Sequence, residues 1–377
     1  MIWDCQSISA NSAGKTTKGA GRPVRKERGP AQSIMPKTAK NLWPHIVTLE
    51  NLLDGWRNAS KGKRPTLASA AYWYSLDKNL LETQEQLLNK TWIPKPWRQF
   101  TVCEPKMRLI QAPAFSDRIV HHALMQVVQP FFSRRFVLDT YACQKGKGTH
   151  MASRRTTDFL RAATARWGHP YVIKADISKY FPSISHDILF QRLERIFGDE
   201  GVLWLFRQII YHCGFVERGI PIGCLTSQWL ANLYLDPLDH FVKDEMGLDY
   251  YIRYMDDFVI IGPSKDWCRT VLEQVERFVT LLQLSLNPKT GIYPASHGID
   301  FVGYRHWTTH TLPRKRTMLR ARRQLRQLAE LYSKGRIDPD YIRPRIASWT
   351  GYVQHCDAYV ATRAILDDLV FIKPPSD

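Results

Sequence analysis

An acidic pair set between two apolar runs is the feature that most constrains how this chain can fold. Residues 251–262 read YIRYMDDFVIIG, so Asp256 and Asp257 separate two stretches rich in strand-forming residues. The pattern predicts a β-hairpin with both carboxylates at its tip. Taken alone, the pair fits a solvated turn equally well, because Asp is common in turns.

A further carboxylate, Asp176, ends the apolar run of residues 171–176, which reads as a buried strand. A charge in that position often only caps a turn. If the strand lies beside the hairpin, however, Asp176, Asp256 and Asp257 meet at one edge of a sheet, where like charges repel. Two Mg²⁺ ions relieve this repulsion, since hard oxygen ligands suit that metal. The three carboxylates are therefore predicted to hold two Mg²⁺ ions, or Mn²⁺, for in-line phosphoryl transfer.

The charge balance indicates a polyanionic partner. The chain of 377 residues carries 53 Lys and Arg against 35 Asp and Glu, a formal net charge of +18. No segment reaches the ~18 uninterrupted apolar residues of a membrane-spanning helix, and no apolar signal segment is visible. The seven cysteines are scattered without a CxxC pair, which is typical of reduced thiols in a cytoplasm. We therefore expect a cytoplasmic protein that does not enter a membrane.

The order of the expected elements predicts an α+β fold. Residues 1–34 read as a disordered basic extension, because they contain few large apolar residues. Residues 99–112 read as two short strands. Apolar residues recur at helical spacing in residues 42–57, 66–92, 117–133, 186–197, 225–245, 265–284 and 312–370. Strands and helices thus alternate through the middle of the chain, which favours a sheet with helices behind it.

Together, these segments resemble the reverse transcriptase family. Residues 254–257 match its YxDD catalytic box. Asp176 and Phe181 resemble its first-aspartate motif, in which an aromatic residue five positions on lies under the sugar. Residues 298–304 resemble its primer grip, and Lys289 resembles the lysine motif that comes between. The motifs follow one another in the family's order along most of the chain.

The resemblance implies an RNA-directed DNA polymerase shaped as a right hand. In this α+β architecture, fingers and a helical thumb flank a palm of antiparallel sheet backed by helices. Residues 35–170 are expected to form N-terminal helices and fingers, residues 171–305 the palm with finger helices near 186–218, and residues 306–377 a basic thumb. The expected ligands are template RNA, the RNA/cDNA duplex and deoxynucleoside triphosphates.

Residues 141–150, 220–228 and 348–352 are similar to the reverse transcriptases of diversity-generating retroelements. The GxxxSQ form within residues 220–228 replaces the usual box of group II intron and viral enzymes. The similarity implies error-prone copying of a template RNA, with errors opposite adenine, for mutagenic retrohoming. It also implies a small basic accessory protein that forms a pentamer, and a bacterial or phage origin. The alternatives are a group II intron-like, CRISPR-associated or phage-defence reverse transcriptase, and a non-catalytic RNA-binding relative.

Nucleotide contacts follow from the same resemblance. Ile222 stands where many reverse transcriptases have a Gln that contacts the incoming nucleotide, and the loss of that polar contact should weaken discrimination. Lys106 and Arg108 occupy finger positions where the family places basic residues on the triphosphate. Alternatively, these charges only prevent an exposed hairpin edge from pairing with another strand. The expected nucleotide contacts are Lys106, Arg108, Ile177, Phe181, Ile222, Gly223, Gln228 and Lys289.

Template and primer contacts are expected in three segments. The loop around Gly146 and Gly148 lets backbone approach phosphate, and it reads equally well as a surface turn. Residues 314–326 form a basic run on an expected thumb helix, which favours binding to a nucleic-acid backbone. Gly303 belongs to the primer-grip match. The expected contacts are Lys145, Lys147, Arg154, Arg155, Gly303, Arg316, Arg320 and Arg323.

Phe181 is expected to act as a steric gate, because a ring under C2′ of the incoming sugar excludes a ribose hydroxyl. Replacing Phe181 with Ala should therefore raise ribonucleotide incorporation, about tenfold for each 1.4 kcal/mol of discrimination lost. Primer extension with ribonucleoside triphosphates measures this rate. An unchanged rate would show that Phe181 is only a core residue.

Overall fold

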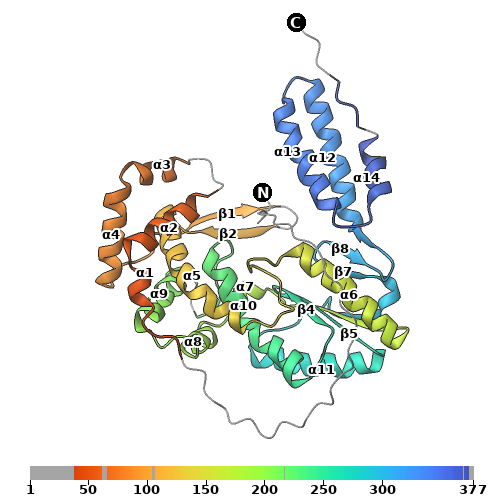
Figure 1. Cartoon of the computed structure of the whole chain (residues 1–377), viewed down its shortest axis with the longest axis horizontal. Helices are drawn as coiled ribbons and strands as arrows, with labels where there is room; N and C mark the ends of the chain where they lie inside the picture. The colour runs from red at the N-terminus through yellow and green to blue at the C-terminus, as the bar shows by residue number, and fades with distance from the viewer. Residues whose placement is uncertain (1–37, 62–65, 104–106, 216, 368, 373–377) are drawn as a thin grey trace, which may run out of the picture. The chain divides into compact units, whose positions relative to one another are not determined.

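The computed structural model describes residues 38–61, 66–103, 107–215, 217–367 and 369–372. The expected extension at residues 1–34 and the expected finger residue Lys106 lie outside these ranges. Figure 1 follows the chain from N-terminal helices, through a central sheet, to C-terminal helices. Within the described ranges, no helix combines the length and the apolarity needed to cross a membrane.

Helices and a short hairpin make up the N-terminal part. The elements are α1 (Trp43–Ile46), α2 (Leu49–Ser60), α3 (Leu67–Tyr74), α4 (Leu76–Leu88), β1 (Arg98–Val102), β2 (Arg108–Ala112) and α5 (Phe115–Arg135). Strands β1 and β2 pair antiparallel, as expected for residues 99–112. Helix α2 packs on α5 at Gly55, where an added Cβ would lie 2.7 Å from the carbonyl oxygen of Ile119. This close approach requires a residue without a side chain.

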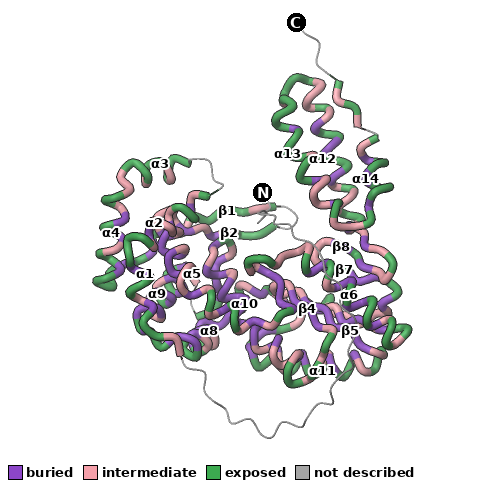
Figure 2. Tube along the Cα trace, in the orientation of Figure 1, coloured by how far each residue is buried: buried purple, intermediate pink, exposed green. Residues whose placement is uncertain are grey.

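A four-stranded antiparallel sheet forms the centre of the fold. Its strands are β3 (Tyr171–Asp176), β4 (Tyr251–Tyr254), β5 (Asp257–Gly262) and β6 (Gly291–Pro294), in the order β4-β5-β3-β6. Strands β4 and β5 form the predicted hairpin, with Met255 and Asp256 at its turn. Strand β5 is buried from Phe258 to Gly262 (Figure 2), which requires cover on both faces of the sheet.

Helices provide this cover. The covering helices are α6 (Thr149–Trp167), α10 (Leu225–His240) and α11 (Lys265–Leu281). Between β3 and α10 the chain forms α7 (Tyr180–Ser183), α8 (His186–Glu194) and α9 (Glu200–Tyr211), and α8 packs on α10. Phe258 and Ile260 of β5 join the core formed with α10 and α11, whereas Val259 and Ile261 join the core formed with α6. Successive strand residues point to opposite faces, so the two cores lie on opposite sides of the sheet. The helix expected over residues 225–245 ends at His240 and continues as a π-helical turn, Phe241–Glu245.

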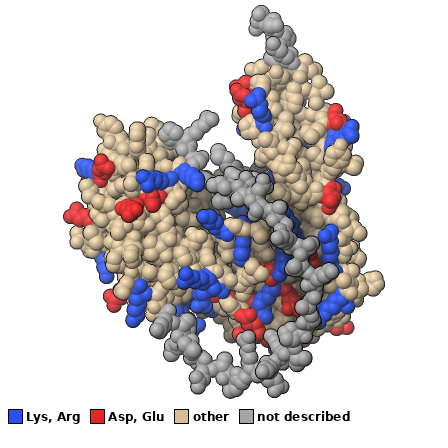
Figure 3. Space-filling view, viewed as in Figure 1, with Lys and Arg blue, Asp and Glu red and all other residues tan. Residues whose placement is uncertain are grey.

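The C-terminal part joins a small antiparallel sheet to three helices. These elements are β7 (Ile299–Phe301), β8 (Tyr304–His306), β9 (Thr311–Pro313), α12 (Lys315–Ser333), α13 (Pro339–Val353) and α14 (Tyr359–Leu366). The boundary expected between residues 305 and 306 falls inside β8, and the helices begin only at Lys315. Leu325 and Leu328 of α12 pack with Trp349 of α13 in a separate core. Figure 3 shows basic side chains in the middle of the visible face and along its sides, with acidic side chains next to some of them.

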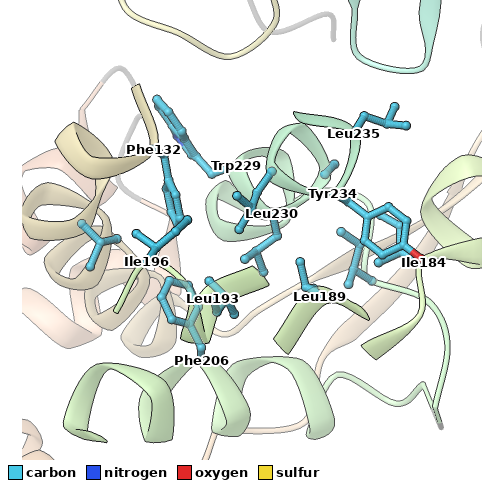
Figure 4. Close-up of a cluster of buried hydrophobic side chains, with 14 of the residues drawn as sticks. Phe132, Ile184, Leu189, Leu193, Ile196, Phe206, Trp229, Leu230, Tyr234 and Leu235 are labelled. Atoms are coloured by element: carbon cyan, nitrogen blue, oxygen red, sulfur yellow. The ribbon is translucent and has the colours of Figure 1, made fainter. Parts of the chain in front are cut away.

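The larger core lies between α5, α8, α9 and α10. The ring of Phe132 lies 5.5 Å from that of Phe197, 6.3 Å from that of Phe206 and 6.2 Å from that of Trp229, measured between centroids. Figure 4 shows Phe132, Phe206 and Trp229 in this cluster. The large apolar area of these rings fixes α10 in the interior. The expected α+β class, with an antiparallel sheet backed by helices and a helical C-terminal part, is confirmed.

Candidate active site

Strand pairing brings the predicted carboxylates together. In the β3–β5 ladder, Asp176 lies directly opposite Asp257, and residues in this relation project from the same face of a sheet. The backbone amide of Ile177 donates a hydrogen bond of 3.1 Å to the carbonyl oxygen of Asp256. The end of β3 is therefore tied to the turn of the β4–β5 hairpin.

Burial and a neighbouring carboxylate shift the pKa of Asp256 upward. Burial and, next, the negative charge of Asp176 raise the pKa of Asp256 above its ordinary value of 3.8. The backbone amide of Asp256 and the positive charges of Arg108 and Lys174 oppose this rise. Asp176 and Asp256 are therefore close enough to repel one another. Arg108, the first residue of β2, is close enough for its charge to act on the same carboxyl.

Asn287 orients Asp176, and sequence reasoning missed it. The side-chain amide of Asn287 donates to Oδ2 of Asp176 at 3.1 Å, and its backbone amide donates to the Asp176 carbonyl oxygen at 2.7 Å. The amide of Lys289 donates to Oδ1 of Asn287 at 3.0 Å, while the Lys289 side chain is exposed. Asn287 stands two residues before Lys289, which the sequence analysis singled out. No local pattern of residues predicts that the Asn287 side-chain amide contacts Asp176.

Lys174 is the basic partner that sequence reasoning missed. Its ammonium contacts a carboxylate oxygen of Asp257 and lies 5.1 Å from the centre of the Phe301 ring. Burial lowers the pKa of Lys174 to about 8, and the carboxylate of Asp300 partly offsets that effect. A signal was available: Lys174 stands two residues before Asp176, so both side chains project from one face of β3.

The donor set fits divalent cations held mainly by two carboxylates. Among the described residues, no three His, Cys, Asp or Glu side chains are grouped to hold one metal ion. At this site Lys174 engages Asp257, while the charge of Asp176 acts on Asp256. Mg²⁺ commonly binds through one or two carboxylates together with substrate phosphates and water. Asp176 and Asp256 thus fit the metal, and the role expected for Asp257 as a third ligand stays a prediction.

The loop expected to contact the nucleotide base rests on strand β2. The amide of Gln111 donates to the carbonyl oxygen of Ile222 at 3.0 Å. Gly223 has a φ of +123°, and an added Cβ would lie 2.8 Å from Cγ2 of Ile110. Both the backbone conformation and the contact with β2 therefore require glycine. Gln228 follows within α10, where it is half-buried.

Phe181 lies beside this loop. Its carbonyl oxygen accepts a hydrogen bond of 3.0 Å from the amide of Ile220. The half-buried Phe181 ring packs edge-to-face on Tyr180, with centroids 5.7 Å apart. Ile177, also expected to contact nucleotide, is buried in the larger core. Hydrogen bonds thus link the segment after Asp176 to the loop of Ile222, as a shared nucleotide site requires.

The central part of the chain also matches a known family. Residues 93–306, more than half of the chain, match the family described as reverse transcriptase (RNA-dependent DNA polymerase). The chain belongs to the reverse transcriptase family. The predictions of an RNA-directed DNA polymerase and of a right-hand polymerase fold are thereby confirmed.

Two curated relatives and one solved structure show how far this similarity extends. Protein YkfC of Escherichia coli (strain K12) is 25% identical over 272 residues, which cover 59% of this chain and 69% of YkfC. The group II intron-encoded protein LtrA of Lactococcus lactis subsp. cremoris is 23% identical over 335 residues, which cover 69% of this chain and 54% of LtrA. Telomerase from Candida albicans, in complex with a fragment of telomeric RNA, has a TM-score of 0.46 at 12% identity, covering 74% of this chain and 56% of that one. The chain therefore spans only about half the length of LtrA.

Two of the four basic residues expected to contact template have partners inside this reverse transcriptase: Lys147 in the loop before α6, and Arg155 within α6. Lys147 donates through Nζ to two backbone carbonyl oxygens, both at 2.8 Å. Arg155 pairs with Asp139 through an Nε–Oδ1 distance of 2.8 Å. Lys145 and Arg154 are exposed. Lys147 and Arg155 therefore help to support the fold here, and contact of the four residues with template stays a prediction.

The expected primer grip of the reverse transcriptase is anchored to α13. Gly303 has a φ of +93°, and its carbonyl oxygen accepts a hydrogen bond of 2.8 Å from the Tyr352 hydroxyl. The rings of Tyr304 and Tyr352 stack with centroids 4.9 Å apart. Residues 348–352 are one of the segments similar to reverse transcriptases of diversity-generating retroelements. Through Tyr352, this segment holds the turn that contains Gly303.

The three arginines expected on the thumb helix lie on α12. Arg316 and Arg323 are exposed and Arg320 is partly exposed. Their spacing places them along one side of the helix. Their contact with a template–primer duplex stays a prediction, since it depends on a ligand.

Replacing Asp256 with Asn should stabilise the metal-free protein and abolish its stabilisation by Mg²⁺. Because folding raises the pKa of Asp256, the wild type loses stability as pH rises above 3.8 through the folded pKa. The variant should therefore melt at a higher temperature than the wild type at pH 7, and lose that advantage below pH 3.8. Mg²⁺ at 100 times its Kd should add about 2.7 kcal/mol to the wild type only.

Thermal unfolding with and without Mg²⁺ measures both effects. Asp249→Asn is the control, since the Asp249 side chain is 77% exposed and should change neither quantity. If Asp256→Asn gained as much from Mg²⁺ as the wild type, Asp256 would not be a ligand.

Proposed function

We propose that this reverse transcriptase copies an RNA template into cDNA by two-metal phosphoryl transfer at Asp176, Asp256 and Asp257. The pairing of β3 with β5 is the observation that supports this most, because it sets carboxylates distant in sequence at one hairpin turn. The raised pKa of Asp256 supports it further, since the repulsion that causes it is relieved by a divalent cation.

The chain's own residues mainly position reactants and balance charge. When bound, divalent metal ions supply Lewis-acid stabilisation of the transferred phosphoryl group and activate the primer 3′-hydroxyl. Asn287 orients the Asp176 carboxylate, and Lys174 orients that of Asp257. Arg108 offers a fork of donors suited to triphosphate oxygens. Phe181 is proposed to pack against the sugar of the incoming nucleotide.

Primer extension on an RNA template tests the proposed activity. With Mg²⁺ and deoxynucleoside triphosphates, the wild type and Asp249→Asn should extend a DNA primer at equal rates. Asp256→Asn should be slower by about 1000-fold, the loss typical when a group that stabilises transition-state charge is removed. Equal extension by Asp256→Asn and the wild type would exclude the proposed site.

The specific type proposed is the error-prone enzyme of a diversity-generating retroelement, acting in mutagenic retrohoming. The support for this type is the similarity of residues 141–150, 220–228 and 348–352 to the enzymes of such retroelements. The proposed partners are a template RNA and a small basic pentameric accessory protein, in a bacterial cytoplasm.

A group II intron-like role is the second candidate, favoured by the similarity to LtrA. Genomic context separates the two candidates. A template repeat, a variable repeat and a small accessory gene near this gene favour the retroelement, and their absence favours the second candidate.

Replacing Ile222 with Gln should lower misincorporation at template adenine, because a polar side chain restores hydrogen-bonded readout. A gain of 1.4 kcal/mol in discrimination would lower the error rate about tenfold. Sequencing of cDNA products measures that rate. Ile93→Gln, at a position 63% exposed, is the control for added polarity. An unchanged misincorporation rate in Ile222→Gln would show that Ile222 does not affect fidelity.

A further inference from the structure

Behind the catalytic turn lies a buried ion pair that the proposed reaction does not use. Arg253 on β4 and Asp239 on α10 are both fully buried, at 0% exposure. Nε of Arg253 lies 2.7 Å from Oδ1 of Asp239, and Nη2 lies 2.5 Å from Oδ2. A buried guanidinium is costly unless paired, so this fork-to-fork contact holds both groups in one geometry.

Two hydroxyl groups complete the surroundings of the carboxylate. The Tyr251 hydroxyl donates to Oδ1 of Asp239 at 2.5 Å, and the Thr140 hydroxyl donates to Oδ2 at 2.8 Å. Each oxygen of Asp239 therefore accepts from Arg253 and from one hydroxyl. A fully satisfied buried network of this kind is rigid and has a unique arrangement.

The remaining nitrogen of Arg253 reaches the catalytic turn. Nη1 donates to the carbonyl oxygen of Met255 at 2.8 Å. Met255 has a φ of +56°, in the left-handed region that costs energy for residues other than glycine. Such a conformation persists only where surrounding contacts hold it. Met255 immediately precedes Asp256, so the direction of the Asp256 backbone depends on that carbonyl.

Arg253 also joins two other segments through its backbone. Its amide donates to the carbonyl oxygen of Asp139 at 3.0 Å, and its carbonyl oxygen accepts from the amide of Tyr141 at 3.0 Å. Its Nη1 lies 3.3 Å from Oδ1 of Asn232 on α10. The residue therefore lies where α10, the segment at 139–141 and the catalytic hairpin meet.

We infer that Arg253, held by Asp239, is a positioning residue that fixes the turn at Met255 and thereby aims the Asp256 carboxylate. The inference rests on the proposed function, since it concerns the same site. A purely structural pair would affect folding stability alone. A positioning pair changes the catalytic rate and the response to Mg²⁺ in molecules that are folded.

Arg253→Lys separates these two roles. Lysine keeps a positive charge beside Asp239 but has no planar fork, so it cannot bind Asp239 and the Met255 carbonyl together. The matched control is Arg135→Lys. Arg135 pairs with Asp236, a neighbouring buried carboxylate of α10, at 3.3 Å, and in the described part of the chain it makes no hydrogen bond or ion pair with the turn at Met255.

In primer extension, Arg253→Lys should lower kcat about 10- to 100-fold, the loss typical of a reacting group displaced by about 1 Å. The KM for the deoxynucleoside triphosphate should stay within about threefold, since nucleotide contacts are intact. The rise in melting temperature with Mg²⁺ should shrink in Arg253→Lys. Arg135→Lys should keep the wild-type kcat and Mg²⁺ response, even if its melting temperature falls.

A folded Arg253→Lys with wild-type kcat and Mg²⁺ response would overturn the inference. If Arg253→Lys does not fold, Thr140→Val replaces it, because the loss of one donor loosens Asp239. An unchanged kcat and Mg²⁺ response in Thr140→Val would then overturn the inference. If the wild type extends no primer, the proposed function fails, and the Mg²⁺ response of the variants still decides whether Arg253 positions the site.

Discussion

The antiparallel pairing of β3 with β5 is the contact on which the rest of the structure depends. A slip of one residue would turn Asp176 and Lys174 to the opposite face of the sheet, because strand side chains alternate. The register is held by apolar residues: Ile173 and Ala175 pack in one core, and Val172 packs in the other. The hydrophobic effect on both faces thus sets the place of the carboxylates, which would repel one another if left alone.

The charges at the site are balanced by neighbours from other parts of the chain. Lys174 engages Asp257, Asn287 donates to Asp176, and Arg253 holds the turn before Asp256. Asp256 keeps a raised pKa despite these contacts, so part of the repulsion persists in the folded protein. The large aromatic core around α10 supplies the stability that such a strained acidic site requires.

Helix α10 connects the two halves of the site. It begins directly after the loop of Ile222 and Gly223, which rests on β2, and it carries Asp239 near its other end. Twelve of its sixteen residues are buried, so the helix cannot shift independently of its surroundings. The proposed nucleotide loop and the catalytic hairpin are therefore held by one rigid element.

Apolar periodicity is a local property, so it was enough to predict the hairpin in residues 251–262, the strand at residues 171–176 and most helices. The family was also indicated, because the order of the motifs along the chain can be read without knowing which residues are in contact. The partner of each charged side chain, in contrast, depends on how distant segments pack. Lys174 meets Asp257, 83 positions away, and Asn287 meets Asp176, 111 positions away. Lys147 and Arg155 take partners within the protein, although the sequence around them predicts a template contact. Such pairings depend on which elements pack together, and no local pattern of residues specifies that.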